Sequence, residues 1–195
     1  PCPHLIACDL DGKNLQAFSF VGRHVEPWEK TCREFQLEPQ SKDFYISSWG
    51  PSYRIYRIDR LSLSVLEETS FRYLKKELKD YNLYDIVSDS KNNRLFFITG
   101  QPPTIIKMNL IEKTAKVLNL TKMGITELGS LIHMMRYDRK LNRIYMIVIT
   151  GDKGGLLIEV DPENMLPTRM LSMPGIVPLS LELDFKNNEI LVGMG

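Results

Sequence analysis

The chain has 195 residues, enough for one domain with a sizeable core or for two small ones. Its 25 Lys and Arg residues balance 24 Asp and Glu residues, so no strong net field favours nucleic acid or an anionic membrane as a partner. The longest apolar runs, such as residues 144–149, are far shorter than the roughly 20 residues of a membrane-spanning helix, so membrane insertion is not expected.

All three cysteines, Cys2, Cys8 and Cys32, lie near the start of the chain. The odd number leaves one thiol over or bonded elsewhere. A Cys2–Cys8 or Cys2–Cys32 disulfide is expected if the protein is secreted, and buried thiols otherwise. Asn119 begins an Asn-Leu-Thr acceptor for N-glycosylation, which has meaning in the same setting. A start at Pro1 is expected after removal of a signal or propeptide, or for a piece of a longer chain. Together these features favour an extracellular protein.

Four similar turns recur along the chain, and a strongly β-prone segment follows each. Alternating apolar and polar residues bounded by Asp, Asn, Gly, Pro and Ser are typical of strands and hairpins. From Pro39 through Asp89 and Asp138 to Asp184, the turns are spaced by 50, 49 and 46 residues. The segments after them are FYIS, RLFFIT, RIYMIVI and EILVGM.

A second family of turns alternates with the first, at steps of 50, 50 and 52 residues. Its members are Asp9–Asn14, Asp59–Ser62, Asn109–Thr114 and Asp161–Asn164. Two interleaved families with the same period indicate a structural repeat of about 50 residues.

We interpret each repeat as a four-stranded antiparallel sheet that cannot bury both of its faces alone, so neighbouring sheets must stack. A ring of such sheets leaves only short edges, so the predicted fold is an all-β β-propeller, with residues 1–195 as one domain. Its strands are named A to D from the centre outward. Residues 1–20 supply strands C and D, residues 33–68, 84–119 and 131–172 supply three full blades, and residues 179–195 supply strands A and B.

The incomplete first and last repeats leave two arrangements open. The last A–B pair complements the first C–D pair, so the two could join and close a ring of four blades. Alternatively, the repeats are part of a ring of six, seven or eight blades, and their free edges then associate with another chain.

The turn chemistry resembles that of a known class of proteins. The Asp-x-x-x-Asn turns before strand B, and the DLDGKN and DPEN turns between strands C and D, resemble those of six- to eight-bladed propellers, which include the NHL, YWTD and lactonase-like groups. Residues 5–18 look like a YWTD-type hairpin, although no blade carries that tetrapeptide. The resemblance implies the fold and no particular function.

The longest segment outside the repeat is residues 67–82. Phe71, Leu74 and Leu78 fall at spacings of three and four, and Lys and Glu fill the other face. This pattern predicts a short amphipathic helix or, alternatively, an elongated linker.

The loops between strands D and A and between strands B and C lie on one face of a propeller, where ligands usually bind. Trp, Tyr and Arg carry much of the binding energy at protein interfaces. The candidates on this face are Arg23, His24, Trp28, Trp49, Tyr53 and Asp152. We therefore predict a non-catalytic interaction protein that binds a protein, a glycan or a second copy of itself.

Strand A lines the central channel and offers Asp85, His133, Arg136 and Glu182. Only alternate residues of a strand point the same way, and the sequence does not fix which of these point inward. Asp85, His133 and Glu182 could supply part of a Ca²⁺ site, so a metal-dependent hydrolase or lactonase is the alternative function. No pattern predicts a catalytic nucleophile, and no cofactor is expected outside that alternative.

Overall fold

A computed structural model of the protein describes residues 4–7, 16–19, 32–37, 43–48, 54–59, 61–70, 83–99, 102–126, 130–151 and 154–195. The elements it gives within these ranges are β-strands, all paired antiparallel, and the 3-10 turn η2 (Ser90–Asn92). The chain forms two compact units, Pro1–Tyr73 and Leu74–Gly195, and each is described by itself. None of the helical segments in these ranges is long and apolar enough to cross a membrane.

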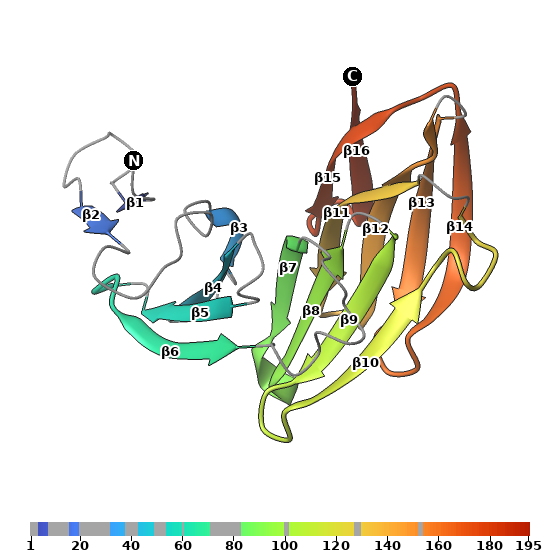
Figure 1. Cartoon of the computed structure of the whole chain (residues 1–195). Coiled ribbons are helices and arrows are strands. Elements are labelled where there is room, and N and C mark those ends of the chain that lie inside the picture. Colours follow the sequence, from blue (N-terminus) through green and yellow to red (C-terminus); the bar gives the residue numbers. More distant parts are fainter. Residues whose placement is uncertain are drawn as a thin grey trace. The chain divides into compact units, whose positions relative to one another are not determined.

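The first unit contains a two-stranded and a four-stranded sheet (Figure 1). The two-stranded sheet pairs β1 (His4–Ala7) with β2 (Gln16–Ser19). The four-stranded sheet has the sequential order β3 (Cys32–Leu37), β4 (Asp43–Ser48), β5 (Arg54–Asp59) and β6 (Val65–Ser70). Each strand pairs with the next along the chain, as predicted for a blade.

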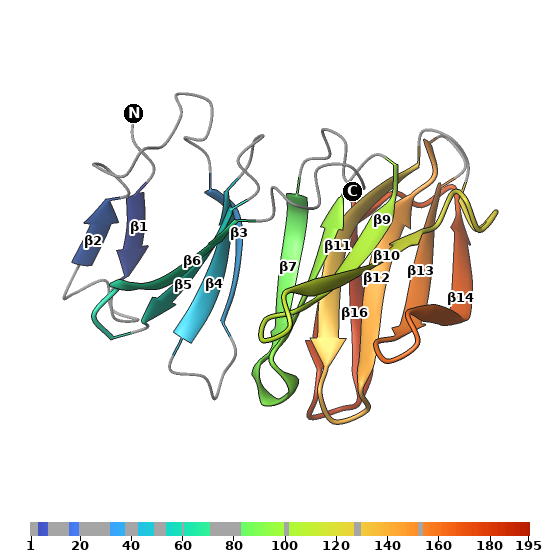
Figure 2. The same cartoon turned by 60° about the horizontal axis from the view of Figure 1, so that its bottom comes forward.

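The second unit contains two four-stranded sheets and one strand pair (Figures 1 and 2). The first sheet is β7 (Leu83–Asp89), β8 (Arg94–Thr99), β9 (Thr104–Asn109) and β10 (Thr114–Asn119). The second is β11 (Leu131–Asp138), β12 (Arg143–Ile149), β13 (Gly154–Asp161) and β14 (Leu166–Pro174). The pair is β15 (Pro178–Asp184) and β16 (Glu189–Met194).

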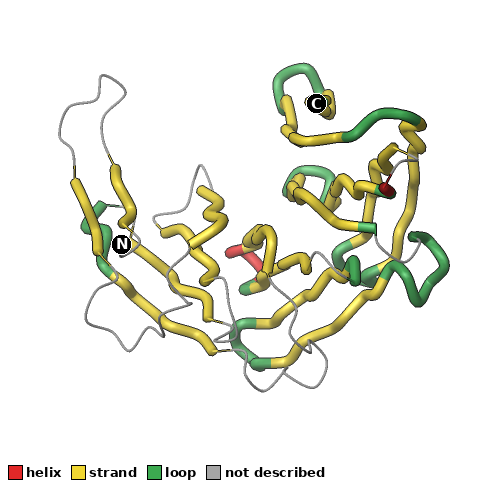
Figure 3. Tube along the Cα trace, turned by 45° about the horizontal axis from the view of Figure 1, so that its top comes forward, coloured by secondary structure: helices red, strands yellow, loops and turns green. Residues whose placement is uncertain are grey.

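The first strands of these three sheets, β7, β11 and β15, are neighbours, which confirms their assignment as strand A of successive blades. Figure 3 shows the three sheets following one another, with strands in yellow and turns in green. The strand order and the antiparallel pairing confirm the predicted propeller architecture.

The two turn families share one geometry, which explains why their sequences recur. In both, an Asp or Asn side chain accepts hydrogen bonds from backbone N–H groups two or three residues later, as Asp138 Oδ1 does from Lys140 (2.8 Å) and Leu141 (3.0 Å). The fourth residue after it has a left-handed backbone, with φ between 51° and 57°. These left-handed residues are Leu63, Asn93, Lys113, Asn142, Met165 and Asn188.

Every strand A has an irregular register near its start. Strands β3, β7, β11 and β15 each have one more residue there than the partner strand. The extra residues are Arg33, Tyr84, His133 and Leu179. One extra residue shifts the alternation of a strand, so the side chains after the bulge point to the opposite face from that expected in a regular strand. The bulge therefore determines which side chains face the neighbouring blade.

The two four-stranded sheets of the second unit pack over an apolar core. It includes the fully buried Phe96, Ile98, Ile105, Ile132 and Met146, and burying such a side chain stabilises the fold by about 1.5–3 kcal/mol. A smaller cluster joins the β11–β14 sheet to the β15–β16 pair and contains Tyr145, Ile147, Leu181 and Leu183.

The predicted helix over residues 67–82 is wrong at its start, because residues 67–70 belong to β6. These residues pair with β5 through a bulge, Arg57 lying opposite Glu67 and Ile58 opposite Val65. The backbone groups that β5 leaves to be paired outweigh the helical preference of the short Glu-Glu-Thr-Ser segment. Residues 71–82 lie outside the described ranges.

Candidate functional site

The candidates for the loop face all lie outside the described residues, so their clustering stays a prediction. They are Arg23, His24, Trp28, Trp49, Tyr53 and Asp152.

The candidates for covalent modification are also untested. Cys2 and Cys8 lie outside the described residues, and Cys32 is the first residue of β3, with Ser48 as its backbone partner. Asn119 ends β10 and is partly exposed, and its Oδ1 accepts a hydrogen bond from the backbone N–H of Lys122 at 2.9 Å. Disulfide formation, glycosylation and an extracellular location stay predictions.

Three of the four channel candidates lie together on β7, β11 and β15. The Oδ2 of the buried Asp85 accepts a hydrogen bond from the backbone N–H of Met135 at 2.8 Å, and its Oδ1 accepts one from Ile86 at 2.8 Å. The Arg136 guanidinium lies between two carboxylates, with Nη1 3.4 Å from Asp85 Oδ2 and Nε 3.4 Å from Glu182 Oε2. The row therefore links the first strands of three successive blades.

This row is suited to holding strands together. Both Asp85 oxygens accept backbone hydrogen bonds, and the neighbouring Arg136 charge repels a second cation, so Asp85 is poorly placed to bind Ca²⁺. Met134 makes the corresponding contact one blade later, since its Sδ lies 3.3 Å from the backbone N–H of Leu181. Within the described ranges, no three His, Cys, Asp or Glu side chains form a group that could hold a metal.

His133 is not joined to this row. It is the extra residue of the β11 bulge, and its Nδ1 is buried without a hydrogen-bond partner in the part of the chain that the structure describes. Its role in the channel stays a prediction.

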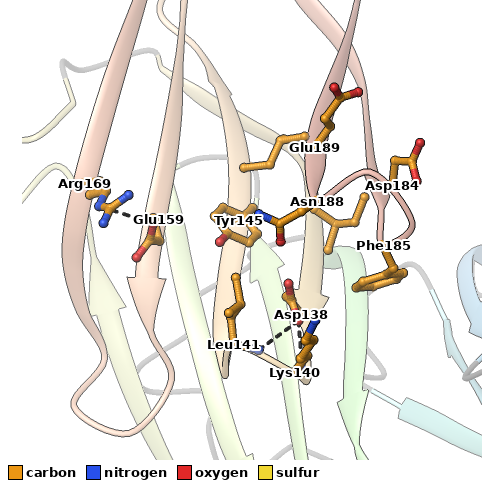
Figure 4. A pocket seen from close by; sticks show the side chains of 12 residues that line it. Asp138, Lys140, Leu141, Tyr145, Glu159, Arg169, Asp184, Phe185, Asn188 and Glu189 are labelled. Atoms are coloured by element: carbon orange, nitrogen blue, oxygen red, sulfur yellow. Dashed lines mark hydrogen bonds and ion pairs between the residues drawn. The ribbon is translucent and has the colours of Figure 1, made fainter.

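A pocket that the sequence did not predict lies between the β11–β14 sheet and the β15–β16 pair (Figure 4). Its volume is about 230 Å³. Four carboxylates and two cations line it, which gives a formal charge of −2 when all are ionised. These residues are Asp138, Glu159, Asp184, Glu189, Lys140 and Arg169.

Tyr145 of β12 stands between Glu159 and Asn188 in this pocket (Figure 4). Its side chain is well buried, with the residue 7% exposed, and it lines the pocket. Burial, with the negative charges of Glu159 and Asp138, raises the pKa of Tyr145. The hydroxyl is therefore protonated at neutral pH and can both donate and accept a hydrogen bond.

Glu159 of β13 has one occupied oxygen and one with spare capacity. Its Oε1 accepts hydrogen bonds from Arg143 Nε at 3.1 Å and from Thr168 Oγ1 at 2.8 Å. Its Oε2 lies 3.9 Å from Arg169 Nε, beyond hydrogen-bond distance, and accepts no hydrogen bond from the described residues. The pocket thus contains a carboxylate oxygen that accepts no hydrogen bond from the described residues, next to the Tyr145 side chain.

In the preceding blade, a turn of the chain occupies the position that corresponds to the pocket. Two rows of register partners have the same position in consecutive sheets: Phe96, Lys107 and Lys116 in the first, and Tyr145, Glu159 and Arg169 in the second. The turn between β13 and β14 packs on the first row. There, Lys107 Nζ donates to the carbonyl oxygen of Pro162 at 2.9 Å, and Lys116 Nζ donates to that of Asn164 at 2.6 Å. On the second row, the same place is the pocket.

The same turn takes part in an ionic network between the two sheets. The buried Asp89 accepts hydrogen bonds at Oδ2 from Arg94 Nε (3.0 Å) and Nη2 (2.5 Å), and Arg94 Nη1 donates to Glu163 Oε1 at 2.7 Å. Burial opposes ionisation of Asp89, but hydrogen bonds from Asn92 and Arg94 hold its pKa below the ordinary value. Burial and the Asp89 charge raise the pKa of Tyr137, whose hydroxyl is 3.2 Å from Asp89 Oδ2, to about 12.

The sequence contained one indication of the pocket. Where the first sheet has Phe96, Lys107 and Lys116, the second has Tyr, Glu and Arg. Such a change of charge at repeat-equivalent positions indicates that the two sheet faces meet different groups.

Comparisons with known proteins support the fold alone. No protein-family model matches the sequence, and no curated protein is significantly similar to it. Among solved structures, the chain is similar to the β-propeller domain of Myceliophteria thermophila Cps50 (Swd1), with 12% identity, a TM-score of 0.59, and coverage of 85% of this chain and 49% of that one. It is also similar to Kuenenia stuttgartiensis hydrazine synthase, with 11% identity, a TM-score of 0.63, and coverage of 88% and 44%. The WD40 β-propeller domain of Doa1 gives 11% identity, a TM-score of 0.59, and coverage of 87% and 50%.

The chain is therefore a β-propeller repeat protein, in agreement with the sequence prediction. It spans half or less of the length of these structures. Likenesses at 11–12% identity show the fold alone, so the function of this chain must be argued from its own surfaces.

Proposed function

We propose that the protein is a non-catalytic interaction propeller that binds a protein partner on one open sheet face. This open face is the outer half of the β11–β14 sheet on the side of the β15–β16 pair, formed by Leu157, Glu159, Arg169 and Leu171.

The proposal rests on a difference in exposure between two residues at equivalent positions of consecutive blades. Leu118 and Leu171 have the same position in consecutive blades, the first opposite Ile105 and the second opposite Leu157. Leu118 is 7% exposed and belongs to the core between the two sheets, whereas Leu171 is 59% exposed. A leucine that belongs to the core in one blade and faces solvent in the next indicates a surface that a partner covers.

The neighbouring edge supports the same proposal. In the described part of the chain, β16 is hydrogen-bonded to β15 alone, so its other side offers backbone groups to a further strand. Large apolar side chains are also exposed on the adjoining strands. They are Leu166 on β14, and Leu191 and Met194 on β16. Strand addition and apolar contact would act together at this place.

The experiment is a selection of displayed peptides on the immobilised full chain, followed by affinity measurements on two variants. Leu171→Glu should weaken the selected binders by at least about tenfold, because it places a charge in an apolar contact. Ile111→Glu is the matched control, because Ile111 is an exposed apolar residue in a turn of the preceding blade. Binders that respond equally to both variants, or to neither, would refute the open face as the binding surface.

A further inference from the structure

We propose that the pocket beside Tyr145 receives a Lys or Arg side chain from the turn of a β-hairpin supplied from outside these 195 residues. The inference rests on the proposed function, because the strands of the hairpin would lie on the same open face.

The geometry follows from the blade before. Its outer strands, β9 and β10, hold the β13–β14 hairpin of the next sheet through its turn. Lys107 Nζ donates to the carbonyl oxygens of Pro162 (2.9 Å) and Glu163 (3.2 Å), and Lys116 Nζ to that of Asn164 (2.6 Å). A hairpin turn is therefore what this position in the repeat accommodates, and two cations select its acceptor groups.

On the open face, the charge at the position nearer the propeller axis is negative, whereas it is positive in the preceding blade. Glu159 takes the place of Lys107, while Arg169 keeps the positive charge of Lys116. Glu159 is mostly buried, with its side chain 13% exposed, so an incoming group would meet it largely shielded from water. A cation is therefore favoured where the preceding blade takes a carbonyl oxygen.

The polar groups in the pocket match the head of a cationic side chain. Glu159 Oε2 lies 3.9 Å from Arg169 Nε and accepts no hydrogen bond from the described residues, and the Tyr145 side chain lines the same cavity. Neither Glu159 Oε2 nor the Tyr145 hydroxyl is among the buried side-chain atoms that lack a partner in the described ranges, so both are open to a donor that enters the cavity. An ammonium or guanidinium group could donate to Glu159 Oε2 and to the Tyr145 oxygen together. The cavity of about 230 Å³ has room for such a group.

The chain itself provides the probe. A backbone-cyclised peptide that copies Gly154–Pro174 reproduces the hairpin that the preceding blade holds, and cyclisation compensates for the marginal stability of an isolated hairpin. Two versions would be titrated into the full chain by calorimetry, the parent with Glu163 and a Glu163→Lys version. We expect the Lys version to bind about tenfold more tightly, as is typical of a coupled charge pair.

Two variants of the protein complete a double-mutant cycle. Glu159→Lys recreates the Lys107 arrangement and should reverse the preference between the two peptides. Tyr145→Phe removes only the hydroxyl and should weaken the Lys peptide about threefold without changing the affinity of the parent peptide. The urea midpoint of each variant shows whether it is folded.

The outcomes separate this inference from the proposed function. Equal affinities of both peptides for the wild type and for Glu159→Lys would overturn the cationic turn and leave the open face standing. If neither peptide binds while displayed binders still respond to Leu171→Glu, the hairpin is wrong and the proposed function survives. Slow hydrogen exchange along the free edge of β16 in the monomer without peptide would show that this chain covers the face itself. A dimer that the peptide dissociates would identify a second copy as the occupant. Either of the last two results would overturn an occupant from outside the chain.

Discussion

The Arg94→Met substitution tests the ionic network between the two sheets of the second unit. The Arg94 side chain is 7% exposed, and its partner Asp89 is 2% exposed, so the substitution leaves a buried carboxylate without its guanidinium. Removing one partner of a buried ion pair typically costs about 3–5 kcal/mol. We expect about 3 kcal/mol here, the lower end of that range, because Asn92 and Tyr137 still contact Asp89.

Urea unfolding at neutral pH, followed by circular dichroism, measures this loss, and hydrogen exchange of β8 and β11 amides localises it to the second unit. Arg143→Met is the matched control, because Arg143 has the same repeat position as Arg94 and pairs with Glu159 at 3.1 Å. Its side chain is 35% exposed, so water screens the pair. We expect Arg143→Met to cost at most about 1 kcal/mol.

The pH dependence provides a second check. In the wild type the pKa of Asp89 is lowered on folding, so its stabilising contribution is present above the unfolded pKa and is lost as the pH falls through the folded pKa. In Arg94→Met, burial without the guanidinium raises that pKa instead, so protonation relieves the penalty and the difference from the wild type shrinks toward pH 4. Adding Asp89→Asn should recover most of the loss at neutral pH, because no buried charge is left unpaired. Equal losses for Arg94→Met and Arg143→Met, or a loss independent of pH, would refute the network as a buried ion pair.

Three further predictions use the repeat as an internal control. Leu118→Ala should cost about 3 kcal/mol, whereas Leu171→Ala at the equivalent position should change the free energy of unfolding by less than about 0.5 kcal/mol; similar losses in urea would contradict the difference in burial. Asn93 has φ 51°, so Asn93→Ala should cost about 1 kcal/mol while Asn93→Gly costs little, and thermal melting would expose an error if both variants behave alike. Asp85→Ala should cost about 1–3 kcal/mol and accelerate hydrogen exchange at the Met135 amide, its hydrogen-bond donor; unchanged exchange there would exclude Asp85 as a link between blades.

The strands and their turns were predictable because their causes are local. Asp138 and Asn142 mark one turn, with the Asp side chain accepting backbone hydrogen bonds and the Asn having a left-handed backbone. These interactions involve only five consecutive residues, so the same residue types recur at each turn of the sequence. The predicted blade at residues 84–119 accordingly agrees with β7 to β10 to within one residue.

The start of the helix predicted over residues 67–82 was wrong because a local pattern competed with a non-local partner. Residues 67–70 follow Leu66 in a segment that β5 pairs, since β5 lies beside it and leaves backbone groups to be paired. A local sequence pattern contains no information on whether a neighbouring strand has a free edge.

The direction of the channel residues also depended on tertiary structure. The bulges at Tyr84 and His133 interrupt the alternation of β7 and β11, so counting residues could not show that Asp85 and Arg136 meet. The pocket was hidden for a related reason, since Tyr145 and Glu159 are adjacent only through strand register.

The sequence by itself determined the repeat, the order of the strands and the propeller class, because turns and the alternation of strands depend on residues that are close together in the sequence. The tertiary structure decided which side chains meet across blades, and it identified the open face and the pocket. Those features depend on register, bulges and the strands that cover each sheet, and these are set by contacts between residues far apart in the chain.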